Sequence, residues 1–260
     1  MGGQVPRGRE RICFLAAASE EARIAVDRLA SRYGNIPAEE CHVIVALGGD
    51  GFMLQTLHDT RELGCPVYGM NRGSIGFLMN SYDTDNLRSR LEAAEEEIVN
   101  PLSMDAVDLS GRHHKALAIN EVSLFRACPQ VIKLRIFVDG RSRLDELVCD
   151  GALVCTPAGS TAYNYSAHGP ILPLGSDVLA LTAMAAFRPR RWRGALLPKS
   201  ASVKFEVLEP EKRPCMADAD GRSATRVREV SVAIEPSIKH RILFDPGLGL
   251  QERLLREQFE

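Results

Sequence analysis

Asp50 has the clearest chemical potential in this sequence, because it lies inside a glycine turn, Gly48–Gly51. Glycines let backbone N–H groups approach an anion, and a helix that begins at such a turn adds about half a positive charge there. An aspartate beside phosphate is repelled unless it binds a metal ion or accepts a proton from an attacking hydroxyl, and both are tasks in phosphoryl transfer. The turn predicts a kinase, although glycine and aspartate also favour turns and helix caps for structural reasons alone.

A second polar segment, Thr156–Ser166, combines small residues, hydroxyls and two aromatic rings. We expect Ser160 or Thr161 to cap a helix whose free N–H groups would meet a nucleotide. Tyr163 offers a flat face to a base or a nicotinamide ring. The alternative is a polar loop with a capped helix, since short motifs carry a false-positive risk. The pair Asn120–Glu121 adds an amide and a carboxylate at the end of an expected strand, which says little in isolation.

Strands and helices alternate over the first hundred residues and would position the glycine turn. Apolar runs predict strands, and apolar residues at helical spacing predict helices. The expected strands are 12–16, 44–47 and 66–70, and the expected helices run from Ser19 to Tyr33, from Phe52 onward, and from an Asp83 cap to near Asn100. Their order implies a parallel sheet, and its glycine loops would leave the carboxyl ends of the strands, where such sheets bind ligands.

After Pro101 the apolar pattern changes from helical spacing to alternation. Strands are expected at 133–138, 203–207 and 227–234, with a turn at Asp139-Gly140. We therefore predict an α/β domain with a parallel sheet and helices, and a β-rich, sandwich-like C-terminal domain. The predicted boundaries are 1–100, completed by 245–260, for the first domain and 101–244 for the second.

The end of the sequence has the spacing of an amphipathic helix. Leu250, Leu254, Leu255 and Phe259 fall on one side of it, and charged residues fall on the other. We expect this C-terminal helix to return to the first domain and pack there. The alternative is a frayed terminus.

Composition limits the class of protein and its partners. The chain has 260 residues, and 32 Lys and Arg against 34 Asp and Glu give no electrostatic reason to expect nucleic acid as a partner. Its seven cysteines are scattered, without a CxxC pair, and predict reduced thiols in a cytoplasmic protein. We expect no membrane partner, because the longest apolar run, 178–187, is too short to span a bilayer. The arginine-rich segment 188–193 is expected in a subunit interface or a solvated loop.

Four segments together resemble the NAD kinase family, in the family's order and spacing and over essentially the whole chain. They are GGDG at Gly48–Gly51, NxGxxGFL at Asn71–Leu78, Asn-Glu at 120 and 121, and DG…TPxGSTAY from Asp150 to Tyr163. The resemblance implies transfer of the γ-phosphoryl group of ATP, with Mg²⁺ or another divalent cation, to the 2′-hydroxyl of the adenosine ribose of NAD. It also implies an α/β domain, a β-rich NAD-binding domain and a returning tail. A homo-oligomer, either a dimer or a tetramer, is expected.

The resemblance also implies roles for individual residues. Asp50 is similar to the family's catalytic base. The glycines of both loops would let the ATP triphosphate approach the backbone, and no residue is implied as a resident metal ligand. The implied phosphate- and dinucleotide-binding set is Gly48, Gly49, Gly51, Asn71, Gly73, Asn120, Glu121, Asp150, Ala158, Thr161, Ala162, Tyr163, Asn164 and Ser166.

The sequence departs from the family pattern at three places. Ala158 stands where Thr or Ser is frequent, His168 precedes Gly169-Pro170 where Gly is more usual, and Ala185-Ala186 differs from a frequent His-Ser pair. None of these changes removes a residue assigned to the chemistry. They bear on dinucleotide specificity and on interfaces.

Two other functions fit parts of the pattern. A lipid kinase of the diacylglycerol or sphingosine type shares the GGDG loop, but no apolar lipid-binding stretch is recognisable here. A noncatalytic dinucleotide sensor would keep Tyr163 and Asp150 but could lose Asp50, so the presence of Asp50 favours an enzyme. The sequence lacks a Walker motif with its lysine, which leaves backbone amides and a divalent cation to stabilise the phosphate charge.

Overall fold

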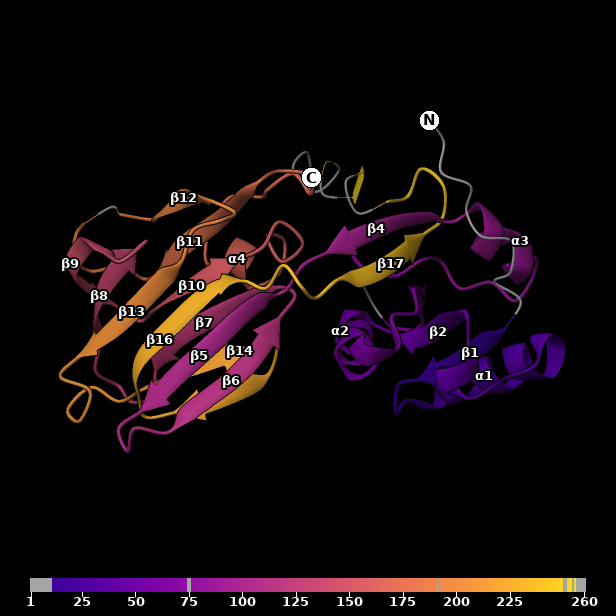
Figure 1. Ribbon diagram of the computed structural model, residues 1–260, viewed down its shortest axis with the longest axis horizontal. Coiled ribbons are helices and arrows are strands. Elements are labelled where there is room, and N and C mark those ends of the chain that lie inside the picture. Colours follow the sequence, from indigo (N-terminus) through magenta and orange to yellow (C-terminus); the bar gives the residue numbers. More distant parts are fainter. Residues whose placement is uncertain (1–10, 74–75, 191, 250–251, 254, 256–260) are drawn as a thin grey trace. The chain divides into compact units, whose positions relative to one another are not determined.

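The protein forms two compact units (Figure 1). The computed structural model describes residues 11–73, 76–190, 192–249, 252, 253 and 255. The first unit contains the chain up to Val99 together with Ile238–Arg256, and the second contains Asn100–Ser237. Within the described residues, the chain therefore leaves the first unit after Val99 and returns to it at Ile238.

The first unit is an α/β domain built on a five-stranded sheet, as the sequence predicted. The sheet has the order β1-β2-β3-β17-β4, in which β1, β2, β3 and β17 are parallel and β4 is antiparallel. Its strands are β1 (Ile12–Ala16), β2 (Val43–Gly48), β3 (Val67–Asn71), β17 (His240–Phe244) and β4 (Glu95–Val99). Its helices are α1 (Glu20–Tyr33), α2 (Asp50–Asp59) and α3 (Leu87–Ala93), with short 3₁₀ turns at Ala38–Glu40 and Arg61–Leu63.

Local sequence explains the elements that lead to the glycine turn. Every residue of β2 is buried, as expected for a central strand covered on both faces. The Ser19 hydroxyl accepts a hydrogen bond from the backbone N–H of Ala22 at 3.2 Å, which confirms the predicted cap of α1. β2 then runs directly into α2 through Gly49, so that Asp50 becomes the first residue of that helix.

The region before the second unit corrects the prediction of one helix from Asp83 to near Asn100. α3 begins after Asn86 and ends at Ala93, and Asp83 accepts a hydrogen bond from the Asp85 N–H instead of capping the helix. The residues after α3 form β4, in which Glu96 pairs with Arg241 of β17 at 2.7 Å. Three successive glutamates at a helix C-terminus would face the negative end of its dipole, whereas the strand gives one of them a cation.

The return to the first unit begins earlier than the expected residue 245. β17 is inserted between β3 and β4, so residues 240–244 belong to the first unit although the sequence pattern placed them in the second domain. Of the apolar tail residues, Leu255 is exposed, with 51% of its surface accessible. Leu250, Leu254 and Phe259 lie outside the described residues, and so does most of the expected helix.

The second unit is a sandwich of two six-stranded antiparallel sheets. One sheet has the order β12-β11-β10-β7-β14-β15 and the other β6-β5-β16-β13-β8-β9. The strands of the first sheet are β12 (Gly194–Pro198), β11 (Val178–Met184), β10 (Gly151–Cys155), β7 (Glu121–Arg126), β14 (Cys215–Ala219) and β15 (Arg222–Thr225). Those of the second are β6 (His113–Ala118), β5 (Leu102–Asp108), β16 (Val227–Ile234), β13 (Val203–Leu208), β8 (Ile132–Val138) and β9 (Arg141–Cys149).

Alternating side chains from both sheets build one core. Leu124 of β7 and Val154 of β10 belong to the same buried cluster as Phe205 of β13 and Val230 of β16. The predicted strands 133–138, 203–207 and 227–234 correspond to β8, β13 and β16. One further helix, α4 (Tyr163–Ser166), has a single turn and follows β10.

All seven cysteines are free, and five of them are buried, as expected for reduced thiols. Among the helices that the structure describes, none is long and apolar enough to cross a membrane.

Candidate functional site

Asp50 is the first residue of α2 in the first unit, just after the carboxyl end of β2. Its Oδ2 accepts a hydrogen bond from the Phe77 N–H at 2.7 Å, and its Oδ1 accepts one from the Leu78 N–H at 2.9 Å. The two glycine loops of the sequence are thus joined through this carboxylate. Because an ionised carboxylate offers about four lone-pair positions, two remain for another donor.

Opposing influences act on the charge of Asp50. Burial raises the pKa of Asp50 above its usual value, and this is the largest influence. The backbone donors Leu78 and Phe77 and the charge of Arg253 lower the pKa. A carboxylate whose pKa is raised by burial is a better proton acceptor than an exposed one, so the environment suits a general base.

Packing requires glycine at only one of the three positions around Asp50. A Cβ on Gly48 would lie 2.8 Å from the Cβ of Phe52, so that position needs glycine for packing. A Cβ on Gly49 or Gly51 would meet no atom within 4 Å. Gly73 of the second loop lies against Gly49, with 3.5 Å between its ideal Cβ position and the Gly49 Cα. The backbone is therefore open at Gly49 and Gly51, where an anion could approach it.

Asn71 shapes the second glycine loop. Its side-chain oxygen accepts a hydrogen bond from the Gly73 N–H at 2.8 Å, and the next residue, Arg72, donates its N–H to Gly48 at 2.7 Å. These bonds hold the two loops together at the carboxyl ends of β2 and β3. Ser74 and Ile75 of this loop lie outside the described residues.

Asn120 and Glu121 form a tightly held corner in the second unit. Asp220 accepts hydrogen bonds from the Ile119 N–H at 2.5 Å and from the Asn120 N–H at 3.2 Å. Thr156 donates its N–H to the Asn120 carbonyl at 3.0 Å. A Cβ on Gly159 would come within 2.3 Å of the same carbonyl oxygen, so only glycine allows this approach. The segment from Thr156 is thereby fixed against the Asn-Glu pair.

Glu121 has the strongest electrostatic perturbation among the predicted binding residues. Burial, followed by the negative charges of Asp220 and Asp218, raises its pKa from 4.5 to about 8, although a hydrogen bond from the Tyr163 backbone lowers it. Its Oε2 is buried and has no hydrogen-bond partner among the described residues. A buried carboxyl oxygen without a partner has one polar contact left for a ligand to satisfy.

The Thr156–Ser166 segment does not form the capped helix that the sequence predicted. Ala162 is the N-cap of α4 without a side-chain hydrogen bond, so neither Ser160 nor Thr161 caps the helix. The Ser160 hydroxyl instead donates to the Pro157 carbonyl at 2.7 Å and so closes the turn from Pro157 to Ser160. α4 has one turn and offers little of the helix dipole that we expected.

The predicted residues of this segment differ in accessibility. Tyr163 is exposed, with 42% of its surface accessible, Ser166 is exposed, and Thr161 and Ala162 are half-buried. Ala158 is buried. Asn164 is fully buried. Its Nδ2 donates to the carbonyl oxygens of Ser160 and Pro170, and its Oδ1 accepts a hydrogen bond from the Thr182 hydroxyl, so it stabilises the scaffold.

Asp150 lies apart from the other predicted residues of the second unit. It directly precedes β10, and Glu121 pairs with Cys155 at the opposite end of that strand. The separation is roughly 16 Å for a strand of this length. The Asp150 carboxylate is partly exposed and pairs with the Arg126 guanidinium at 2.8 Å. Within one chain, Asp150 is therefore not part of the Glu121 cluster.

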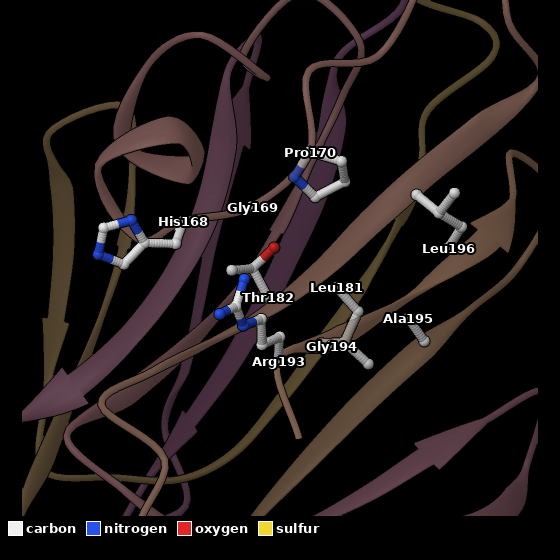
Figure 2. A pocket seen from close by; sticks show the side chains of 9 residues that line it. All are labelled: His168, Gly169, Pro170, Leu181, Thr182, Arg193, Gly194, Ala195 and Leu196. Carbon is white, nitrogen blue, oxygen red and sulfur yellow. The ribbon is translucent and has the colours of Figure 1, made fainter. Parts of the chain in front are cut away.

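A pocket of about 290 Å³ lies on the sheet beyond α4 (Figure 2). Its lining combines the loop after α4, including His168, with Thr182 of β11 and with Arg193 and Leu196 near the edge strand β12. His168 and Leu196 lie at opposite ends of the pocket in Figure 2. His168 has a positive φ of 61°, a conformation that glycine adopts without strain. This is the position where the sequence has His instead of the more usual Gly.

The described residues contain no group of three or more His, Cys, Asp or Glu side chains that could hold a metal ion. A cation that arrives bound to a triphosphate needs only one or two protein carboxylates, or none.

Family comparisons agree with this geometry. The family model described as ATP-NAD kinase N-terminal domain matches residues 16–98, and the model described as ATP-NAD kinase C-terminal domain matches residues 119–237. The chain belongs to the ATP-NAD kinase family. The two matched regions contain Asp50 and the Asn120–Ser166 segment, respectively.

Relatives resemble this family member over nearly their whole length. An NAD kinase of Cereibacter sphaeroides is 65% identical over 250 residues, which are 96% of this chain and 98% of the relative. An NAD kinase of Caulobacter vibrioides is 55% identical over 249 residues, which are 96% of both chains.

Two crystal structures have the same fold. A yeast NADH kinase complexed with NADH has a TM-score of 0.80 at 18% identity, covering 98% of this chain and 92% of that one. An Archaeoglobus fulgidus NAD kinase in complex with ATP has a TM-score of 0.74 at 23% identity, covering 96% and 97%.

Sequence reasoning missed the residues that hold the site together. The donors to Asp50 are backbone groups of Phe77 and Leu78, and the Asn-Glu corner is fixed by Asp220. Asp220 precedes a glycine and has a positive φ of 47°, so the Asp-Gly pair was a turn signal that could have indicated it. No comparable local signal marked Arg253.

Proposed function

We propose that this protein is an NAD kinase, which transfers the γ-phosphoryl group of ATP to the 2′-hydroxyl of the adenosine ribose of NAD and so gives NADP. The observation that carries the proposal is the Asp50 carboxylate, which is half-buried and held by two backbone donors beside an open glycine loop. A ribose hydroxyl is a poor nucleophile, and a base of this kind is what the transfer requires. The names of the relatives support the same reaction.

In this proposal Asp50 accepts the proton of the attacking hydroxyl. The open backbone at Gly49 and Gly51 receives the triphosphate. Gly48, Asn71 and Gly73, which lies against Gly49, shape the two loops around it. ATP would enter with Mg²⁺ or another divalent cation, which would neutralise phosphate charge, since the sequence has no Walker lysine to do so. The protein's part is to orient the phosphates and to remove the proton.

The dinucleotide is assigned to the Glu121 cluster. Asn120 and the unsatisfied Oε2 of Glu121 provide polar contacts to ribose hydroxyls, and the exposed ring of Tyr163 provides a flat surface. Thr161, Ala162 and Ser166 lie beside that ring in sequence and are assigned to the same ligand. Ala158 and Asn164 are buried, so their contribution is to shape the pocket wall.

A homo-oligomer, either a dimer or a tetramer, is part of the proposal. Asp150 lies in the family motif but roughly a strand length from Glu121. We assign the Asp150 carboxylate to a dinucleotide bound by a neighbouring copy. The molar mass measured by light scattering tests the oligomer. Free thiols fit a cytoplasmic location, and neither nucleic acid nor a membrane is proposed as a partner.

Steady-state kinetics of Glu121→Ala and Tyr163→Ala test the acceptor assignment. Each variant should raise KM for NAD about tenfold or more and leave KM for ATP within a few-fold, because each removes roughly 1 to 3 kcal/mol of binding to the acceptor. Tyr165→Ala is a matched control, since Tyr165 is a neighbouring exposed ring that carries no assignment. Equal KM values for NAD in all three variants and the wild type would show that the dinucleotide does not bind at the Glu121 cluster.

A further inference from the structure

Arg253 belongs to the C-terminal tail but contacts the loop that holds Asp50. Its Nη1 donates to the carbonyl oxygens of Gly76 at 3.0 Å and Phe77 at 3.2 Å, and also to that of Met79. Its Nε donates to the Leu248 carbonyl at 2.8 Å. One guanidinium group thus gathers four backbone carbonyls of the first unit.

The carbonyls of Gly76 and Phe77 belong to the same peptide groups that donate to Asp50. The Gly76–Phe77 peptide accepts from Arg253 through its oxygen and donates to Asp50 Oδ2 through the Phe77 N–H. The Phe77–Leu78 peptide does the same for Oδ1 through the Leu78 N–H. A trans peptide is planar, with its C=O and N–H on opposite sides, so each peptide group links the cation to the carboxylate.

We propose that Arg253 is a positioning residue for Asp50, acting through the two peptide groups of the Gly76–Leu78 loop. The proposal rests on the proposed function, in which Asp50 is the base. Hydrogen bonds in a chain polarise one another, so a cation on the carbonyl side strengthens the N–H donors on the other side. Arg253 would thereby fix both carboxylate oxygens and aim the remaining lone pairs.

The backbone of this loop passes close to Asp50 and Met79. A Cβ on Gly76 would lie 2.8 Å from two side-chain atoms of Met79 and 3.4 Å from Asp50 Oδ1. The loop therefore passes close to the carboxylate on one side and to Arg253 on the other. A tail that only anchored the chain terminus would not need to bond these two peptide groups.

The other charged groups near Asp50 have different partners or positions. On α2, His58 and Asp59 are at the far end of the helix. In the loop after β3, the Arg72 guanidinium lies over the Tyr82 ring, 4.3 Å from its centroid, and in the tail Glu252 neighbours Arg253. The charge of Arg253 lowers the pKa of Asp50 and opposes the effect of burial. Its loss should raise the pKa of Asp50.

Arg253→Met and Arg253→Lys, compared with Arg241→Met, test the proposal. Arg241 is a matched control because it also comes from the returning segment and donates to a backbone carbonyl, that of Gly64 at 3.0 Å, but makes no contact with the Asp50 loop. We expect Arg253→Met to lower kcat about 10- to 100-fold with KM for NAD and ATP within a few-fold. The acidic limb of its kcat profile should move to higher pH, and added guanidinium should restore part of kcat. Arg253→Lys should be intermediate, and Arg241→Met should match the wild type.

Titration of the Asp50 carboxyl carbon by ¹³C NMR, assigned with Asp50→Asn, separates this proposal from the assignment of the base. A higher pKa of Asp50 in Arg253→Met than in the wild type is the expected result, whatever reaction the protein catalyses. An unchanged pKa together with wild-type kcat in a folded variant would overturn the role of Arg253. If Arg253→Met does not fold, wild-type kcat and an unchanged pKa in Arg253→Lys and Arg253→Gln would overturn it equally. Full turnover in Asp50→Asn would overturn the base instead.

Discussion

Replacement of Glu121 by glutamine should make the second unit more stable at alkaline pH. The pKa of this carboxyl is raised from 4.5 to about 8, mainly by burial and then by Asp220 and Asp218. The folded protein therefore holds a proton that the unfolded chain releases above pH 4.5. Below that pH both states are protonated and the group has no effect, whereas the free energy of unfolding falls as pH rises from about 4.5 to about 8.

The size of the effect follows from the difference in pKa. One pKa unit corresponds to about 1.4 kcal/mol, so the wild type should lose about 4 kcal/mol relative to Glu121→Gln between pH 5 and pH 8. Glutamine has nearly the same shape and keeps an acceptor for the Tyr163 N–H but does not ionise. The two proteins should therefore have similar stability near pH 5 and diverge above it.

Urea unfolding of both proteins at several pH values measures this difference directly. Glu206→Gln is a control, because Glu206 is in the same unit but is partly exposed and pairs with Arg135 at 3.2 Å. The control should follow the wild-type pH dependence. Parallel curves for the wild type and Glu121→Gln from pH 5 to pH 8.5 would show that the folded protein does not hold the proton on Glu121, and the electrostatic reasoning would fail.

Three further predictions concern the first unit. Asp50→Asn should lower kcat by roughly 10² to 10⁴ with the fold intact, and near-normal turnover would exclude Asp50 as the base. EDTA should abolish transfer from ATP and Mg²⁺ should restore it, so metal-independent transfer would contradict the assigned cation. Gly48→Ala should cost about 1 to 3 kcal/mol of stability because its Cβ would meet Phe52, whereas Gly49→Ala should keep wild-type stability and raise KM for ATP. A stability loss in Gly49→Ala by calorimetry, with a raised KM for ATP only in Gly48→Ala, would refute the roles assigned to these two glycines.

The parallel sheet and the sandwich were predictable because their signals are local. The continuous apolar run of β2 predicts a strand buried on both faces, and the alternation in β13 predicts a strand with one buried face. The structure has both burial patterns. β4 was wrongly predicted as helix because Leu87, Leu91 and Ala94 keep helical spacing up to its first residue. The partner of Glu96, Arg241, lies 145 residues away. Strand pairing of that kind depends on tertiary contacts that no local window contains.

The same limit applies to the candidate site. Asp50 and Glu121 could be identified because residue type and motif point to them. The groups that tune them could not, since the donors to Asp50 are backbone N–H groups and Asp220 reaches Asn120 from 100 residues away. Asn164 was predicted to bind the dinucleotide on its motif position alone, and its hydrogen bonds with Ser160, Pro170 and Thr182 could not be predicted from that motif.

The most direct measurement of the central claim is the identity of the phosphorylated product. Purified wild-type protein would be incubated with Mg-ATP and either NAD or vesicles containing diacylglycerol, with Asp50→Asn as the blank. The account predicts a product that an NADP-specific dehydrogenase reduces, formed in equal amount to ADP, with its new phosphate on the 2′-oxygen by ³¹P NMR, and no lipid phosphate. Phosphorylated diacylglycerol together with unchanged NAD would contradict it.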